Sequence, residues 1–367
     1  MVLKFMLPLK ELESYRVEID NYINEIHPRH FSKEYLSFVS GKIKYKNLSE
    51  DIDKSLSEPN WDMLDRPKSY LRPLIFLLLM GGLGKQPKDF VKYATILELI
   101  HNGTLIHDDI EDYAKTRRGD KPTYLKYGLD IAVNSANLMY FTPFLIFKKY
   151  SKELSDKIKL SAYEVLIEHL NRVTWGQGLD IYWHRVDKIP SIEDYLQMCC
   201  YKTGAIDRMV FSLAGVLAEV SETNHEILNQ FGEKLGICLQ LHDDFSDACS
   251  DDRKVIGGKD IGNDITEGKK SIVNIITLIN LEDKDKRELL NILSEHTSDS
   301  KKIESALRLI EKSNSLVEVL DLAEREFNNI KETSSKILNE KYSKMMNLFI
   351  DAMIEDMKIK YSCRKVR

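Results

Sequence analysis

Apolar residues recur every three or four positions along most of this chain, which is the spacing of amphipathic helices. The pattern is clear at Leu12, Tyr15 and Ile19, and it returns in residues 303–310. Alternation of apolar and polar residues over a strand's length, which is typical of a half-buried strand, is hard to find. The sequence therefore predicts an all-α fold.

The chain shows no clear internal boundary. Its 367 residues could bury one large core or two ordinary ones. Neither a low-complexity linker nor a break in composition divides them. We therefore expect a single domain over residues 1–367.

Composition excludes several other classes of protein. The net charge of −5, from 53 basic and 58 acidic residues, argues against a nucleic-acid binder. Five cysteines form neither a zinc spacing nor a disulfide framework, so a cytoplasmic location fits best. The longest apolar run, which begins at Leu74, is about half of the ~20 residues that a membrane-spanning helix needs, so no transmembrane segment is expected.

Two short acidic segments, residues 108–112 and 243–247, share one spacing of Asp-Asp, two residues and Asp. On a helix, the first and last Asp of each segment lie on one face. Like charges beside apolar sequence cost free energy unless a cation neutralises them. Mg²⁺ commonly binds one or two carboxylates together with substrate phosphates, so the repeat predicts a metal-dependent diphosphate site. The candidate metal ligands are Asp108, Asp109, Asp112, Asp243, Asp244 and Asp247.

Basic side chains near the acidic segments could bind the same phosphates. Arg117 and Arg118 follow the first segment, Lys259 and Lys269 follow the second, and Lys202 precedes a Thr-Gly pair. Arginine can bind phosphate through two parallel hydrogen bonds, whereas lysine acts as a point charge. There is no Walker-type glycine loop, so nucleotide phosphoryl transfer is disfavoured. The repeated layout suggests two helices that face each other across a cavity.

Simpler interpretations compete with a diphosphate site. One acidic segment on a helix would more often be a solvated face, but the repetition of both spacing and basic loop weighs against this. His101, His107 and His242, taken singly, fit packed or hydrogen-bonded residues better than ligands. Aromatic residues around Met139 and Tyr140 fit an ordinary core.

Taken together, the motifs resemble those of the trans-isoprenyl diphosphate (polyprenyl) synthases. The matching residues run from about 66 to 271, in that family's order. The resemblance implies an isoprenoid-synthase fold, a large all-α bundle around a central cavity, which is usually dimeric. Besides the two acidic segments, the matching motifs are Leu71-Arg72-Pro73, Arg117-Arg118-Gly119, Lys202-Thr203-Gly204, Gly258-Lys259 and Glu267-Gly268-Lys269.

The resemblance also implies a reaction and roles for individual residues. The two acidic segments would hold three Mg²⁺ ions, and the chain would condense isopentenyl diphosphate head-to-tail with an allylic diphosphate. Isopentenyl diphosphate would bind Arg72, His101 and Arg118. The allylic diphosphate would meet Arg117, Lys202, Thr203, Gln240, Lys259 and Lys269, with Thr203 and Gln240 turning oxygens toward the allylic cation.

Two positions depart from the family's pattern. The lysine expected three residues before Arg72 is Ser69, and Lys68 lies one position earlier. Whether Lys68 replaces the missing cation is left open. The phenylalanine often found before the second segment's glutamine is Leu239, which removes an aromatic surface but no charge.

Product length can be argued from side-chain size. About one turn before Asp108 lie Gly103 and Thr104, which are both small, and Ile100 lies deeper. A bulky aromatic residue there would form the floor of the elongation pocket in this family. We therefore expect geranylgeranyl diphosphate or a somewhat longer product, and we expect Gly103→Phe to shorten it.

Rival functions remain open at this stage. A terpene cyclase shares the fold and the first acidic segment, but cyclases usually carry a different second metal motif. A non-catalytic partner subunit of a prenyl synthase is a second alternative, although both acidic segments are intact. A helical protein that binds divalent metal without chemistry is the third.

Overall fold

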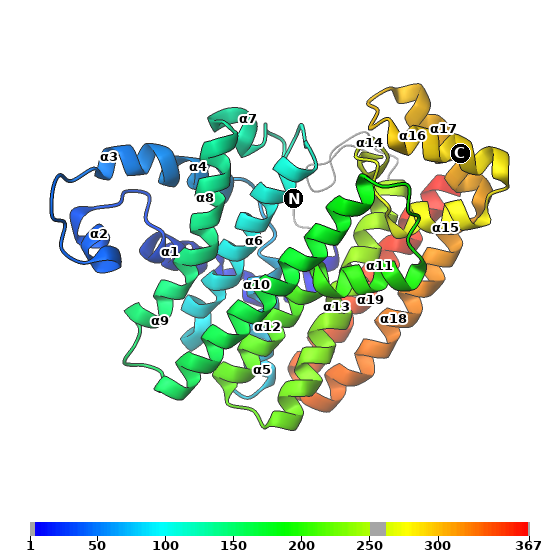
Figure 1. Cartoon of the computed structure of the whole chain (residues 1–367). Coiled ribbons are helices and arrows are strands. Elements are labelled where there is room, and N and C mark those ends of the chain that lie inside the picture. Colours follow the sequence, from blue (N-terminus) through cyan, green and yellow to red (C-terminus); the bar gives the residue numbers. More distant parts are fainter. Residues whose placement is uncertain (1–3, 250–261, 366–367) are drawn as a thin grey trace. The chain divides into compact units, whose positions relative to one another are not determined.

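The computed structural model describes residues 4–249 and 262–365 of the chain. These residues are mostly helical and contain no β-strand, which confirms the all-α prediction (Figure 1). Contacts divide the chain into two compact units, a first unit of Leu9–Tyr163 and a second unit of Met1–Pro8 with Glu164–Arg367. The single domain expected over residues 1–367 stays a prediction.

The first unit is built around α6 (Val91–Glu111), which packs against α1 (Arg16–Ile26), α5 (Leu71–Gly82) and α8 (Leu129–Phe141). All residues of α6 from Val91 to Ile100 are buried except Lys92, so apolar contacts surround its first half. The other elements of this unit are α2 (Lys33–Ser40), α3 (Ser49–Ile52), η2 (Asp53–Ser57), α4 (Glu58–Leu64), η3 (Pro87–Phe90), α7 (Thr123–Tyr127), η4 (Thr142–Phe144) and α9 (Leu145–Lys149).

Helix α5 holds a buried arginine, Arg72, in its first turn. Pro73 lies in the first turn, where its missing N–H costs no helical hydrogen bond. Every residue from Arg72 to Gly82 is buried, so the apolar run predicted not to cross a membrane forms core instead. Arg72 is thereby held at the N-terminal end of a buried helix.

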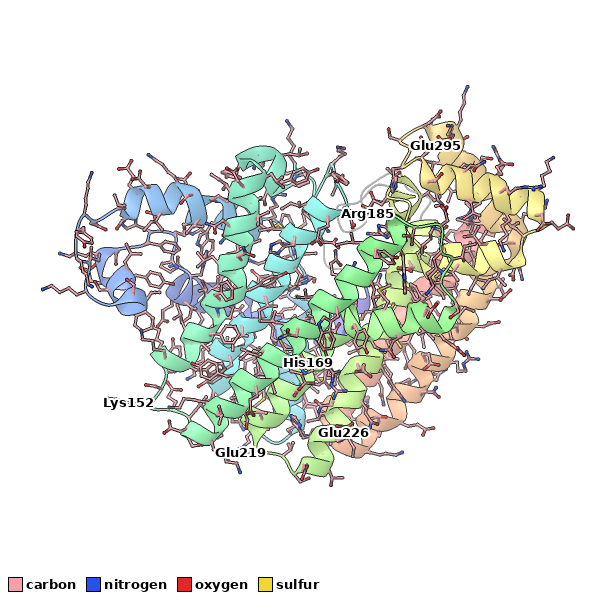
Figure 2. The ribbon with its side chains drawn as sticks, in the orientation of Figure 1. Lys152, His169, Arg185, Glu219, Glu226 and Glu295 are labelled. Carbon is pink, nitrogen blue, oxygen red and sulfur yellow. The ribbon has the colours of Figure 1, made fainter. Side chains whose placement is uncertain are left out.

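The second unit is built around α12 (Thr203–Ala218) and α13 (Glu222–Cys249), which run antiparallel. Figure 2 labels Glu219, which caps the end of α12, and Glu226, which lies near the start of α13. A Cβ atom on Gly236 would lie 2.6 Å from the Cα atom of Gly204, so only glycine allows this approach. The other elements are α11 (Ile192–Tyr201), α14 (Asn263–Thr266), α15 (Ile272–Asn280), α16 (Asp283–Ser294), α17 (Ser300–Ser313), α18 (Ser315–Ile337) and α19 (Glu340–Lys365), while η1 (Lys4–Tyr15) and α10 (Asp156–His184) cross the boundary between units.

The two acidic segments occupy equivalent places in their helices. The first forms the C-terminal end of α6, with Asp112 as its cap, and the second lies in the last two turns of α13 (Figure 1). Their helical structure confirms that the first and last Asp of each segment share a face. None of the described helices combines the length and apolar character that crossing a bilayer requires.

Candidate active site

The first acidic segment contains three carboxylates of unequal exposure. Asp109 is buried at 1% exposure and Asp112 at 8%, whereas the side chain of Asp108 is 18% exposed. Arg117 lies over the first two of them. Its Nε donates to Asp109 Oδ1 at 2.7 Å, and its Nη2 lies 3.4 Å from Asp108 Oδ2. The segment thus already contains one cation, which partly offsets the cost of gathering these charges.

The loop that carries Arg117 is held in place by Arg66. The guanidinium of this buried residue donates to the carbonyl oxygens of Arg117 and Lys121, at 2.9 and 2.8 Å. Arg118 has a left-handed backbone, with φ of 51°, which reverses the chain at this point. The loop therefore presents Arg117 and Arg118 from a fixed backbone.

The three residues expected to bind isopentenyl diphosphate lie close together in the first unit. Arg72 Nη1 donates to His101 Nδ1 at 3.2 Å, and Arg118 donates to Asn102, the next residue of α6, at 3.0 Å. Burial, together with the charges of Arg72 and Arg118, holds the pKa of His101 well below its usual value. His101 is therefore a neutral acceptor beside two cations, and the cluster carries positive charge suited to an anion.

Lys68 has its own partners in the first unit. Its side chain is only 5% exposed, its Nζ lies 3.2 Å from Asp20 and donates to the Leu64 carbonyl oxygen, and it sits 4.8 Å from the centre of the Tyr70 ring. Ser69 is half-buried, and its carbonyl oxygen accepts a hydrogen bond from Arg16. Lys68 is thus already paired within the first unit.

Gly103 lies at a close contact between α6 and α8, and its place in a chain-length pocket stays a prediction. A Cβ atom there would lie 3.1 Å from both Met139 and Tyr140 and 3.2 Å from the Ala136 carbonyl oxygen, all on α8. Gly103 allows α6 and α8 to approach, so a larger side chain there requires its neighbours on α8 to shift. Thr104 is half-buried, whereas Ile100 is fully buried.

Tyr140 lies beside this contact. Its ring stacks on His107 with centroids 5.2 Å apart, and the hydroxyl lies 3.2 Å from His107 Nδ1. Burial raises the pKa of Tyr140 above its usual value, so the hydroxyl keeps its proton. His107 is thus a packed and hydrogen-bonded residue, as the simpler interpretation predicts.

In the second acidic segment the three carboxylates differ sharply. The side chain of Asp243 is 78% exposed, whereas Asp244 is buried at 5%. Asp244 accepts hydrogen bonds from the Tyr195 hydroxyl at 2.7 Å, the Gln240 amide at 2.8 Å and the Ile272 backbone N–H at 2.9 Å. Burial raises the pKa of Asp244, and these three donors oppose it. Asp244 is held by the protein, while Asp243 is open to solvent.

Asp247 organises the chain that follows the segment. Its two oxygens accept the backbone N–H groups of Asn263 and Asp264, both at 3.1 Å. Burial and the nearby Asp247 and Asp244 carboxylates raise the pKa of Asp264 well above its usual value. Asp264, which the sequence pattern does not single out, is therefore a further carboxyl group beside the second acidic segment.

Lys202 is fixed by a buried acid on α10. Its Nζ lies 2.6 Å from Asp180, which also accepts from His184 at 3.0 Å. Burial favours the neutral carboxyl, but Lys202 and His184 outweigh it and hold the pKa of Asp180 far below its usual value. Gly176 allows α10 to approach the Lys202 backbone this closely, since a Cβ atom at position 176 would clash with the backbone nitrogen of Lys202. Lys202 is therefore a charged side chain in a defined position.

Thr203 and Gln240, expected to direct oxygens toward a cation, contact each other. Thr203 Oγ1 donates to Gln240 Oε1 at 2.5 Å, and the Gln240 amide nitrogen donates to Asp244. This chain of hydrogen bonds fixes which end of the Gln240 amide is the oxygen. Lys269 pairs with Glu267 at 2.5 Å, and Lys259 lies outside the described residues.

Sequence reasoning missed the residues that hold these groups in place. Tyr195, Asp180 and Asp264 contact site residues that are distant in sequence or in another element. Only Asp180 had a local signal, because it is an acid four residues before His184 in a helix that contains two glycines. The expectation that the two acidic segments face each other stays a prediction.

Comparisons with known proteins agree with this geometry. A family model described as polyprenyl synthetase matches residues 53–310. A geranylgeranyl diphosphate synthase of Sulfolobus acidocaldarius is 28% identical over 319 residues, which cover 87% of this chain and 92% of that protein. A geranylgeranyl pyrophosphate synthase of Dictyostelium discoideum is 35% identical over 245 residues, which cover 67% and 75%.

The fold is also found among solved structures. The crystal structure of geranylgeranyl pyrophosphate synthetase from Pyrococcus horikoshii superposes with a TM-score of 0.80 at 24% identity. The match covers 96% of this chain and 99% of that one. The predicted isoprenoid-synthase fold is confirmed.

Proposed function

Because the chain belongs to the polyprenyl synthetase family, we propose that this prenyltransferase condenses isopentenyl diphosphate with an allylic diphosphate to give geranylgeranyl diphosphate or a somewhat longer trans-polyprenyl diphosphate. One observation carries the proposal. Each Asp-Asp-x-x-Asp segment ends a long helix; Arg117 pairs with the first segment, and Lys269, which pairs with Glu267, follows the second along the chain.

Divalent metal is the cofactor that these residues suit. Asp108 and Asp112 lie one helical turn apart, and Asp243 is open to solvent, so hard oxygen donors are available in both segments. Mg²⁺ in such a site would neutralise the charge that develops on departing diphosphate. We propose three ions, with these three aspartates as their principal ligands. The buried Asp109 and Asp244 are better suited to hold Arg117 and the Tyr195 hydroxyl.

The basic residues would divide between the two substrates. We propose that Arg72, His101 and Arg118 bind isopentenyl diphosphate, since His101 is neutral between two cations and can accept or donate a hydrogen bond. The allylic diphosphate would meet Arg117, Lys202, Lys259 and Lys269. The fixed Gln240 amide oxygen would face developing positive charge, as oriented dipoles do in other active sites.

We also propose a homodimer in a reducing cytoplasm. In the second unit, α10 exposes Ile167, Trp175 and Tyr182, which are seven or eight residues apart and therefore share a face. Trp175 is 58% exposed, which is costly for a large apolar side chain unless a partner covers it. The five thiols are unpaired, as expected in reducing conditions. Trp175→Glu should shift the mass measured by light scattering from dimer to monomer.

The main test is turnover by the purified chain alone. Incubation with Mg²⁺, isopentenyl diphosphate and dimethylallyl, geranyl or farnesyl diphosphate should give linear prenyl alcohols after dephosphorylation. Asp108→Ala and Asp243→Ala should each lose most activity, as should chelation of the metal. Asp156→Ala, which removes a carboxylate that is 99% exposed, is the matched control.

Other results would favour the rival functions. A cyclic hydrocarbon from a single allylic substrate would indicate a terpene cyclase. Absence of turnover that a second synthase restores would indicate a partner subunit. Near-normal rates in Asp108→Ala or Asp243→Ala would contradict the proposed metal ligands.

A further inference from the structure

The C-terminal helix α19 holds the end of α13 that carries the second acidic segment. Asp356 accepts a hydrogen bond from His242 Nε2 at 2.8 Å, and Lys360 donates to Ser246 Oγ at 2.8 Å. Lys360 and Asp356 also form an ion pair of 2.5 Å. His242 and Ser246 are four residues apart on α13, as Asp356 and Lys360 are on α19, so the contacts form a closed ladder between two helix faces.

Burial and charge make this ladder rigid. The His242 ring is only 5% exposed, and the Lys360 side chain is 14% exposed. Burial acts to raise the pKa of Asp356, but the hydrogen bonds from His242 and Lys360 outweigh it and lower that pKa to about 2. Asp356 is therefore a charged acceptor for both residues at neutral pH, and such hydrogen bonds are stronger than neutral ones.

A third contact extends the ladder to the last turn of α13. The Arg364 guanidinium donates to the Ala248 carbonyl oxygen and, at 3.0 Å, to the carbonyl oxygen of Leu307 on α17. The last carbonyl groups of a helix lack partners within it, and a basic side chain there stabilises the terminal turn. The acidic segment lies in the last two turns of α13, where a helix is otherwise least constrained.

The ladder determines where the acidic face points. His242 and Ser246 immediately precede Asp243 and Asp247, and neighbouring residues on a helix differ by a fixed rotation. Holding the first pair against α19 therefore sets the direction of the second pair. His242 also lies beside Asp243, with Nδ1 and Oδ1 3.8 Å apart.

We propose that Asp356 and Lys360 are positioning residues that hold the end of α13, and with it Asp243, in the orientation needed to bind metal and diphosphate. This inference rests on the proposed function of the second acidic segment. Residues that orient metal ligands from outside the ligand set commonly change metal affinity by about 10–100-fold when they are removed. Neither Asp356 nor Lys360 needs to contact the substrate for this effect.

The same helix offers a matched control. Lys358 of α19 pairs with Glu324 of α18 at 2.5 Å, the same distance as the Lys360–Asp356 pair. This ion pair joins α19 to α18 and involves no residue of the acidic segment. Lys358→Met therefore removes an ion pair from α19 without touching the ladder.

The experiment measures binding of Mn²⁺ to the full chain in the presence of inorganic pyrophosphate, by the loss of the free-ion signal in electron paramagnetic resonance. Asp356→Ala and Lys360→Met should each weaken binding about tenfold. Lys360→Arg, which keeps a donor, should restore most of it, and Lys358→Met should stay within about twofold of the parent chain. Thermal unfolding of each variant without metal separates a local effect from general loosening of α19, and Lys360→Met remains the test if Asp356→Ala does not fold.

Three results would overturn the inference, and they differ in whether the proposed function would still hold. Parent-like Mn²⁺ binding by Asp356→Ala and Lys360→Met would remove the positioning role but leave the proposed function intact. An equal loss in Lys358→Met would reduce the ladder to ordinary helix packing. Failure of the parent chain to bind Mn²⁺ with pyrophosphate would remove the metal site itself and the inference with it.

Discussion

The Tyr195 hydroxyl donates a hydrogen bond to Asp244 over 2.7 Å, and both residues are buried. Burial already raises the pKa of Asp244, and this bond is one of the contacts that opposes the rise. Tyr195→Phe would remove one hydrogen-bond donor from the buried Asp244 carboxyl group. We expect the free energy of unfolding to fall by about 1.5–3 kcal/mol, measured in urea.

Tyr182→Phe is the control for this prediction. Tyr182 is 59% exposed, so removal of its hydroxyl should change the free energy of unfolding by no more than about 0.5 kcal/mol. Equal stability of Tyr195→Phe and the parent chain would show that the hydroxyl contributes nothing to holding Asp244.

The helical frame and the two acidic segments could be predicted because their signals are local. Apolar spacing indicates that α6 and α13 are helices, and each Asp spacing spans about one helical turn. The contacts that distinguish the aspartates are not local. Tyr195 is 49 residues from Asp244, and Asp356 is 114 residues from His242, so no pattern along the chain indicates either pair.

Gly103 illustrates a different limit of sequence reasoning. A small residue one turn before Asp108 fits a deep pocket, but it also fits close packing of two helices. The choice depends on α8, whose Met139 and Tyr140 lie 3.1 Å from the position that a Cβ atom on Gly103 would take. The structure shows the close contact, and whether a pocket also begins there stays a prediction.

This packing changes the expected effect of a larger residue near the acidic segment. Gly103→Phe should lose at least about 1–3 kcal/mol of folding free energy, because it overpacks the contact with α8. Thr104 is half-buried, and its hydroxyl bonds to the His101 carbonyl oxygen of its own helix, so a larger side chain there should disturb the core less. We expect Thr104→Phe to fold and to shorten the product, as judged by chromatography of the released alcohols. A stable Gly103→Phe chain, or an unchanged product from Thr104→Phe, would contradict this account.

The missing cation near Arg72 leads to a gain-of-function prediction. Lys68 is paired with Asp20, so we expect it not to serve the cluster of Arg72, His101 and Arg118. Ser69→Lys would place a new ammonium group three residues before Arg72. One added charge-assisted contact should lower the KM for isopentenyl diphosphate about tenfold with kcat little changed.

Lys68→Met tests the other half of this argument. It removes the ion pair with Asp20 and should lower stability, but the KM for isopentenyl diphosphate should stay within about twofold of the parent value. A large rise in that KM would show that Lys68 does contact the substrate. Kinetics at saturating allylic diphosphate measure both variants.

His27 should make stability depend on pH in the first unit. The residue is 0% exposed, and burial lowers its pKa from 6.5 to about 4. Between those values the unfolded chain binds a proton that the folded chain does not, so the free energy of unfolding decreases as pH falls. The stabilising contribution is complete above about pH 6.5, and about 3 kcal/mol of it is lost by about pH 4.

Asn60 donates to His27 Nε2 at 3.3 Å, and His27→Gln keeps an acceptor for it without a titrating group. Urea unfolding at about pH 7.5 and pH 4.5 should therefore show a drop that is smaller in His27→Gln by about 2–3 kcal/mol, because all other titrating groups are common to both proteins. Equal drops in the two chains would mean that His27 is able to take up its proton without leaving the folded structure.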